Sequence, residues 1–463
     1  MIKLLFMLPL FAGASWAGTT YYSGTQTQPA YNRLLEQLNN LDFLAVESVE
    51  YNTGFLNSTA ITKLSTKADK KAAKNKGSDD EAEADKAMYL YHEISHSPIS
   101  MIPANARFGA AKIVTTLMVD KIEDQKTREK LKAFENGTPF VLQTNVEIDG
   151  ETKNELTLNP LNFSDASATI NSTGGKINML TTPDGLYKGD LKLGESTTVI
   201  TDGEPLKLRI GETDAAYHFE QIDELLFNID AGFDIDSIVA SDDGGSGLGE
   251  ITITGVSANY DVTLTGDAPT VTAESAIGDI SHPIVPLKSM NQTFAIEGFS
   301  ADALTEYSTD IRAWAAADAN GESYPAPSEE QIADIMKRTF KPGTSMRNHT
   351  HATTTDGDMD IKLDFTFLGN GSPSGSDGME TIGDLARTIA GNLAIKADTD
   401  AVMNSFIGPM LMDSPAVNYF VIGDEFITLD ANLNNLKLKV NDETIPLDLL
   451  IGHMLDAPLT TIF

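Results

Sequence analysis

The chain of 463 residues contains no cysteine, and it carries 33 basic residues against 67 acidic ones. Without cysteine it has no disulfide framework and no thiolate chemistry. Its formal net charge of −34 repels the phosphate backbone of nucleic acids and anionic lipid headgroups. We therefore expect no nucleic-acid partner, and contact with a membrane only through the N-terminus.

Long apolar runs are also missing, except at the N-terminus. Residues 4–17 read LLFMLPLFAGASWA behind the basic residue Lys3, which is the layout of a secretory signal. No further charge appears before Arg33, so a retained membrane anchor within residues 1–24 is the alternative to a cleaved signal. No later segment reaches the roughly 18 to 20 apolar residues that cross a bilayer. We expect the remainder to be periplasmic, either anchored to the inner membrane or released after signal cleavage.

What dominates the chain from residue 88 onward is alternation of apolar and polar residues. The clearest examples lie at 140–148, 251–253, 361–367 and 436–440. A period of two residues is typical of half-buried strands, and turn signals such as Asp184-Gly185 separate them. The sequence predicts an α+β fold that is rich in β-strands, with antiparallel meander sheets and peripheral helices concentrated in the C-terminal third.

The helical patterns and the composition divide the chain further. Spacings of three and four residues, or capping signals, predict helices at 31–41, 301–316, 328–336, 379–390 and 400–412. The predicted regions are a signal peptide or anchor at 1–24, a β-rich periplasmic region at 25–300 and a mixed helix and strand region at 301–463. Within the second region, residues 67–86 carry a basic half and an acidic half without bulky apolar residues, which predicts a mobile loop.

One motif suggests zinc chemistry. His92-Glu93-Ile94-Ser95-His96 matches H-E-x-x-H, which on a helix places two imidazoles one turn apart beside a general base. The surrounding residues favour a strand, where positions four apart lie roughly 13 Å apart, too far for His92 and His96 to share one ion. We predict that this motif is not a zinc site, and a zinc metallohydrolase is only a remote alternative.

Other candidate sites are weaker. His349 and His351 share one face of a predicted strand and are half of a metal site, but no third ligand is evident in the sequence. The acidic run 356–360 resembles the start of a calcium loop, yet the required glycine and glutamate are missing, so we predict a hairpin turn. The glycine-rich run 244–249 is not followed by a helix and predicts a loop. We predict no catalytic residues, no cofactor and no metal, and hence no enzyme.

Several short motifs in order along the chain resemble the YdgA-like family of bacterial envelope proteins, whose function is not established. Their positions are Tyr22-Ser23-Gly24, 51–55 with Gly54, His96-Ser97-Pro98, Gly137 to Phe140, 158–163, Gly174-Gly175 and 438–442. The positions that carry the match are Tyr22, Gly24, Gly54, His96, Pro98, Pro139, Phe140, Pro160 and Leu161.

The resemblance implies an inner-membrane or periplasmic protein, and it favours a retained N-terminal anchor. It also implies that the family's histidine is His96, ahead of Pro98, rather than the pair His92 and Glu93. Ser97 stands where relatives have glycine, and residues 67–86 resemble an insertion.

We therefore predict a non-enzymatic envelope protein that binds or scaffolds a partner, including itself as a homodimer, through an extended β-sheet. The alternative is lipid or apolar-ligand binding and transport in the periplasm, for which the sheet must present an open apolar groove rather than a filled core.

Overall fold

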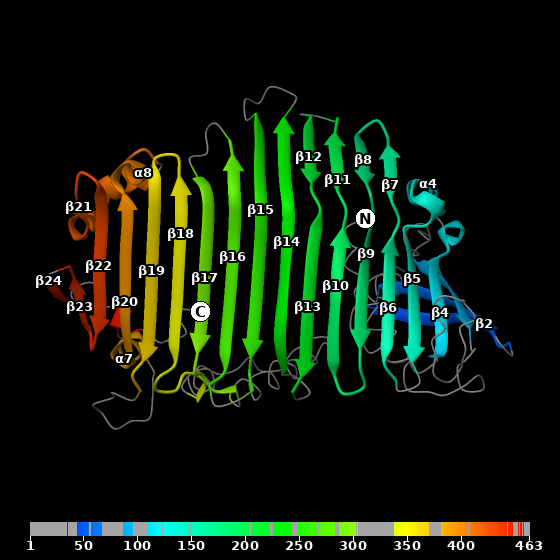
Figure 1. The fold of residues 1–463 in the computed structure, drawn as a ribbon, viewed down its shortest axis with the longest axis horizontal. Helices are drawn as coiled ribbons and strands as arrows, with labels where there is room; N and C mark the ends of the chain where they lie inside the picture. The colour runs from blue at the N-terminus through cyan, green and yellow to red at the C-terminus, as the bar shows by residue number, and fades with distance from the viewer. Residues whose placement is uncertain are drawn as a thin grey trace, which may run out of the picture. The chain divides into compact units, whose positions relative to one another are not determined.

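A computed structural model describes the chain in segments, which Figure 1 shows as coloured ribbon. The described residues are 44–54, 57–66, 87–95, 109–122, 124–147, 150–202, 205–222, 226–242, 249–265, 268–282, 287–301, 338–369, 381–405, 407–441 and 443–447, with single positions at 35, 303, 452, 454, 455 and 457. The predicted fold class is confirmed, because antiparallel strands dominate and the helices lie mostly toward the C-terminus.

The chain forms two compact units. Unit 1 comprises residues 1–218 and 238–249, and unit 2 comprises residues 219–237 and 250–463. Strand β14 (Phe227–Asp242) therefore contributes to both, since its residues from Ile238 onward belong to unit 1.

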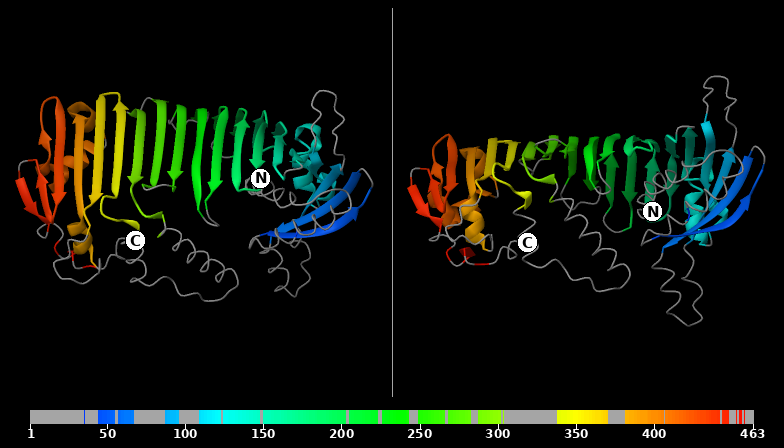
Figure 2. Two further views of the ribbon diagram at one scale, coloured as in Figure 1. Left: turned by 60° about the horizontal axis from the view of Figure 1, so that its bottom comes forward. Right: turned by 90° about the horizontal axis from the view of Figure 1, so that it is seen from below.

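Unit 1 begins with an antiparallel meander in which β1 pairs with β2, β2 with β3, β3 with β4, β4 with β5 and β5 with β6. These strands are β1 (Leu44–Asn52), β2 (Asn57–Thr66), β3 (Met88–Ser95), β4 (Gly109–Leu117), β5 (Phe140–Glu147) and β6 (Thr152–Leu158). Between β4 and β5 lie η3 (Val119–Lys121), α4 (Gln125–Leu131) and η4 (Glu135–Gly137). Figure 2 shows β1 and β2 turned steeply away from the direction of β5 and β6.

The rest of unit 1 contains long strands that are interrupted at mid-length. The paired segments are β7 (Leu161–Ser164), β8 (Ala168–Ser172), β9 (Gly175–Thr181), β10 (Leu186–Leu193), β11 (Ser196–Ile200), β12 (Leu206–Ile210) and β13 (Thr213–Gln221), which belongs to unit 2 from Phe219 onward. Gly174-Gly175 separates β8 from β9 without reversing the chain, because β9 pairs with β6 and β10 while β8 pairs with β7 and β11. Gly174 has φ +82°, so this interruption favours glycine.

The core of unit 1 lies between this curved sheet and its short helices. Alternation in β5 buries Phe140 and Leu142, and Leu156 of β6 packs beside them. Leu131 of α4 closes the same cluster. A fully buried leucine or phenylalanine contributes roughly 2–3 kcal/mol to folding, so this cluster contributes strongly to the stability of unit 1.

Unit 2 is an antiparallel sheet of long neighbouring strands. Its members are β15 (Glu250–Thr263), β16 (Thr270–Ser281), β17 (Leu287–Glu297), β18 (Ser345–Thr354), β19 (Gly357–Phe367), β20 (Ile389–Asp398), β21 (Val421–Ile422), β22 (Phe426–Asn434), β23 (Lys437–Val440) and β24 (Glu443–Pro446). From β15 to β20 each strand pairs with the next, and β20, β22, β23 and β24 continue the order, with β21 alongside β22.

Short helices of unit 2 lie between the last strands. They are α7 (Ile382–Thr388), α8 (Thr399–Met403), α9 (Ile407–Asp413) and the 3-10 turn η5 (Pro415–Tyr419). Helix α7 begins with a capping box formed by Thr381 and Asp384. The predictions at 379–390 and 400–412 correspond to α7, α8 and α9, although the chain enters β20 already at Ile389. The predicted helices at 31–41, 301–316 and 328–336 and the loops at 67–86 and 244–249 lie almost wholly outside the described residues.

Candidate apolar-ligand site

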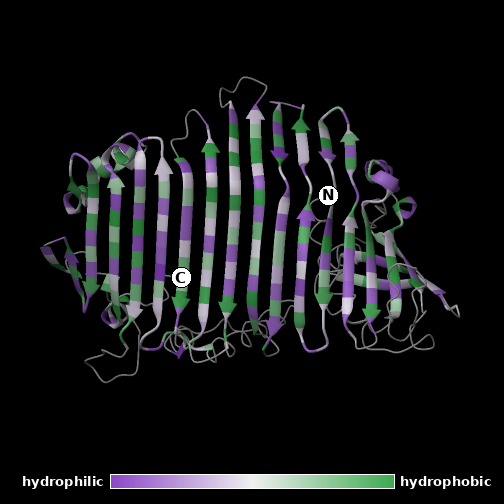
Figure 3. Ribbon diagram, in the orientation of Figure 1, coloured by the Kyte–Doolittle hydropathy of each residue, from purple (hydrophilic) through white to green (hydrophobic). Residues whose placement is uncertain are grey.

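Hydropathy alternates along the strands of unit 2, as the bands in Figure 3 show, and this alternation gives the sheet an apolar and a polar face. The ladder pairs Tyr260 with Ala273, Ala273 with Phe294, Phe294 with Asn348, Asn348 with Leu363, and Leu363 with Leu393. Residues directly opposite in antiparallel strands share a face. We define the apolar face by these partners and by every second residue on either side of them in each strand. Counted from the first residue of each range, every second residue belongs to it in 256–262 of β15, 271–277 of β16, 290–296 of β17, 346–354 of β18, 359–367 of β19, 389–397 of β20 and 427–433 of β22, together with Leu438 and Val440 of β23.

None of the described residues on the apolar face is charged. The opposite face carries the charges, for example Arg347, which pairs with Glu297. Within the apolar face, seven residues are buried, namely Val262, Thr354, Gly391, Ala397, Ile427, Ala431 and Val440. Most of the other side chains are only half-buried, and Tyr260 is 43% exposed. A packed core buries such residues more completely. The apolar face is therefore partly open among the residues that the structure describes.

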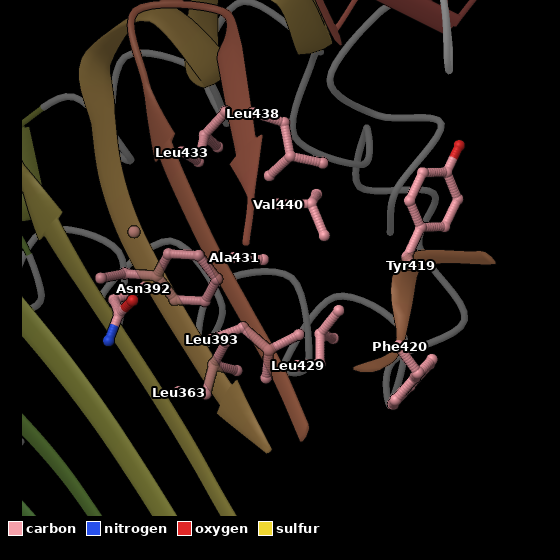
Figure 4. A pocket seen from close by; sticks show the side chains of 12 residues that line it. Leu363, Asn392, Leu393, Tyr419, Phe420, Leu429, Ala431, Leu433, Leu438 and Val440 are labelled. Atoms are coloured by element: carbon pink, nitrogen blue, oxygen red, sulfur yellow. The ribbon is translucent and has the colours of Figure 1, made fainter. Parts of the chain in front are cut away.

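A hollow of about 330 Å³ lies at the β19 to β23 end of the apolar face. It is lined by 12 residues, Leu363, Phe365, Gly391, Asn392, Leu393, Tyr419, Phe420, Leu429, Ala431, Leu433, Leu438 and Val440. In Figure 4 the side chains of Leu393 and Leu429 extend from neighbouring strands toward the hollow, and Tyr419 and Phe420 stand opposite them. Its volume matches the lower end of the range for small-molecule sites.

Two local features give the hollow its shape. Gly391 has no side chain, and the Phe365 ring lies over it, with Cδ1 at 2.6 Å from the point where a Cβ at 391 would lie. On the other side, Tyr419 at the end of η5 and the following Phe420 stand across the hollow from Leu393 and Leu429. Phe420 also packs against the small cluster of Ala397, Val402 and Ile427 that joins α8 to the sheet. The hollow is thus held by packed elements on both sides.

The two histidines predicted to share a strand face do so on β18, on the polar side of the sheet. His349 Nε2 lies 3.1 Å and His351 Nδ1 3.3 Å from the same Asp360 Oδ1 on β19. The hydrogen bond with His349, followed by that with His351, lowers the pKa of Asp360. Asp360 is the neighbour that the sequence did not reveal. Within the described segments, no group of three or more His, Cys, Asp or Glu residues is arranged so that it could hold a metal ion.

His92 lies on β3, so the prediction of a strand for the H-E-x-x-H motif is confirmed. Its Nε2 is 2.7 Å from Thr62 Oγ1 on β2, and its Nδ1 is 2.8 Å from Thr115 Oγ1 on β4. Burial lowers the pKa of His92 from 6.5 to about 4, so the imidazole is neutral at neutral pH. These contacts connect three strands inside unit 1. His96 lies outside the described residues.

Four of the residues that carry the family resemblance gather in unit 1. Pro139 accepts a hydrogen bond from the Asn159 amide, Phe140 is buried, and Pro160 accepts one from the Glu135 amide. Pro160 and Leu161 line a second hollow of about 640 Å³ where β6 passes into β7.

The remaining residues of this set lie earlier in the chain. The Gly54 amide donates to Ser58 Oγ near the turn between β1 and β2. Tyr22, Gly24 and Pro98 lie outside the described residues. The turn between β18 and β19 is Thr355-Asp356, so the acidic run at 356–360 begins in this turn and continues into β19, which confirms the predicted hairpin.

Comparison with known proteins adds a family and no activity. None of the helices described in the structure combines the length and the hydropathy needed to cross a membrane. No curated protein and no solved structure shows significant similarity to the chain. Residues 1–448 match the family described as bacterial protein of unknown function, DUF945. Because this match extends over nearly the whole sequence, the chain belongs to that bacterial family.

Proposed function

We propose that the protein binds an apolar ligand on the apolar face of unit 2, with the hollow between β19 and β23 holding the ligand's hydrocarbon part. The observation that carries the proposal is the junction of an apolar hollow of about 330 Å³ with an uncharged, half-buried strand face. Each CH₂ group that leaves water for such a surface contributes about 0.8 kcal/mol, so a chain of ten carbons contributes about 8 kcal/mol, from which the cost of association is subtracted.

The proposal includes a periplasmic location. The predicted signal or anchor at residues 1–24 favours the periplasm, and the YdgA-like resemblance supports the same location. A carrier or sensor of apolar ligands in that compartment needs no catalytic group, in keeping with the prediction of a non-enzymatic protein. The high net negative charge opposes adsorption to anionic membrane surfaces, so binding depends on the apolar face rather than on electrostatic attraction.

The test is fluorescence titration of the purified protein with N-phenyl-1-naphthylamine, an uncharged apolar dye. We expect saturable binding by the wild type and at least a tenfold weaker affinity for Leu429→Asp, because a carboxylate in the hollow has to be desolvated when the dye enters. The matched control is Thr428→Asp, whose side chain lies on the polar face opposite Lys396. Circular dichroism checks that both variants fold.

The proposal fails if the wild type does not bind the dye, or if Leu429→Asp and Thr428→Asp bind it equally well. The prediction of a protein partner or of a homodimer stays a prediction. An amphipathic peptide would use the same apolar face, and competition between such a peptide and the dye would reveal it.

A further inference from the structure

Two amide side chains interrupt the apolar face. Gln292 of β17 and Asn348 of β18 are both half-buried, and Gln292 Nε2 donates a hydrogen bond of 3.2 Å to Asn348 Oδ1. Gln292 lies opposite Thr350, and Asn348 lies opposite Phe294 in the same ladder, so both amides project on the side of Phe294 and Leu363. Their partner on β16, Ser275, adds a hydroxyl group to the same patch.

The amide pair lies at a defined distance from the hollow. Asn348 is directly opposite Leu363, which lines the hollow, and Gln292 lies one strand further away. Neighbouring strands are about 4.8 Å apart, so the pair is roughly 5 to 10 Å from the edge of the hollow, measured across the sheet. A ligand whose hydrocarbon chain occupies the hollow therefore places the polar group at the end of that chain next to the two amides.

The chemistry of the pair selects for an uncharged polar group. The hydrogen bond between the two amides uses Gln292 Nε2 and Asn348 Oδ1. The other polar atoms, Gln292 Oε1 and Asn348 Nδ2, have no hydrogen-bond partner among the described residues and are available to a ligand. One is an acceptor and the other a donor, so they match a hydroxyl and a carbonyl of a ligand. No described residue on this face is basic, which leaves a carboxylate or phosphate without a countercharge.

We propose that the ligand is an acylglycerol, with its acyl chain in the hollow and its glycerol ester on the Gln292–Asn348 pair. This inference rests on the proposed function and specifies the substrate class of the same site. The ester carbonyl accepts from Asn348 Nδ2, and a glycerol hydroxyl donates to Gln292 Oε1. The apolar face thereby orients the ligand across the strands from β17 toward β23.

The experiment compares three competitors that displace the apolar dye from the full-length protein: 1-monododecanoylglycerol, dodecanoate and dodecane. We expect the monoacylglycerol to compete about tenfold better than either of the others, a difference equivalent to one or two hydrogen bonds. Gln292→Leu and Asn348→Leu should each remove most of that advantage while leaving competition by dodecane unchanged. Asn291→Leu, on the exposed opposite face of β17, is the matched control.

The outcomes separate the two proposals. If the three competitors are equally effective, or if Gln292→Leu and Asn348→Leu leave the monoacylglycerol advantage intact, the assignment of an acylglycerol is overturned while apolar-ligand binding stands. If dodecanoate competes best, the ligand is an anionic amphiphile and the assignment is equally overturned. If none of the three displaces the dye, both the assignment and the proposed function are overturned.

Discussion

Phe365 of β19 and Gly391 of β20 lie directly opposite each other, and the Phe365 ring occupies the space in which any larger residue at position 391 would place its Cβ. Both residues line the hollow on the apolar face. The absence of a side chain at 391 thus leaves room for the Phe365 ring. This contact is one of the features that shape the hollow.

Gly391→Val should push the Phe365 ring toward the hollow. We expect dye affinity to fall several-fold and the free energy of unfolding to fall by about 1–3 kcal/mol, the usual cost of overpacking. Fluorescence titration and urea unfolding measure the two effects. Ala394→Val on the opposite face of β20 is the control and should change affinity little. Unaltered affinity in a folded Gly391→Val variant would show that the ligand does not use the hollow.

The stability of unit 1 is expected to respond in opposite directions to two similar substitutions. Thr152 is fully buried, and its Oγ1 has no hydrogen-bond partner among the described residues. Thr144 is equally buried, but its Oγ1 donates to Asn154 Oδ1 at 2.7 Å. Thr152→Val should therefore stabilise the protein by about 1 kcal/mol, whereas Thr144→Val should destabilise it by about 1–3 kcal/mol.

Urea unfolding of both variants measures this difference, and each variant is the control for the other, since both exchange a hydroxyl for a methyl group in the same core. Destabilisation by Thr152→Val would mean that its hydroxyl does have a partner in solution, such as a buried water molecule.

His92 predicts a pH dependence of stability. Its folded-state pKa of about 4 lies below the value of 6.5 for the exposed side chain, so the unfolded chain binds a proton more readily than the folded chain. The contribution of the neutral His92 to the free energy of unfolding is therefore fully present above pH 6.5 and is lost as the pH falls toward 4. The loss amounts to about 1.4 kcal/mol for each unit of the difference between the two pKa values. The wild type should thus lose up to about 3 kcal/mol more than His92→Gln between pH 7 and pH 4.

Urea unfolding at several pH values checks this expectation, and His218→Gln, at an exposed position of β13, is the control because it should follow the wild type. Parallel pH profiles for the wild type and His92→Gln would contradict a neutral, buried His92.

Local patterns in the sequence predicted the strands well but not the site. Alternation at 140–148 and 361–367 is visible without a structure, because a period of two follows directly from strand geometry. Gly174-Gly175 has the composition of a turn that reverses the chain, but the chain continues in the same direction there, since glycine with positive φ serves both a reversal and an interruption within a long strand. Only the pairing of β8 and β9 with different neighbours distinguishes the two.

The hollow could not be predicted, because its lining residues come from β19, β20, β22, β23 and the segment after α9, and the sequence does not specify their register. The same holds for Asp360, which joins His349 and His351 only through the β18 to β19 ladder. Gln292 and Asn348 are separated by a long stretch of chain, and their contact likewise depends on strand pairing. Residue type alone gives no signal for the hollow or for the amide pair.

The most direct test of the account is organic extraction and mass spectrometry of full-length protein purified without detergent from a Gram-negative host. We predict an acyl-containing molecule in near-stoichiometric amount with the wild type and with Ala394→Val, and several-fold less with Gly391→Val. Recovery of no acyl-containing molecule from the folded wild-type protein, or of equal amounts from all three proteins, would contradict the claim that the apolar face of unit 2 is a ligand site.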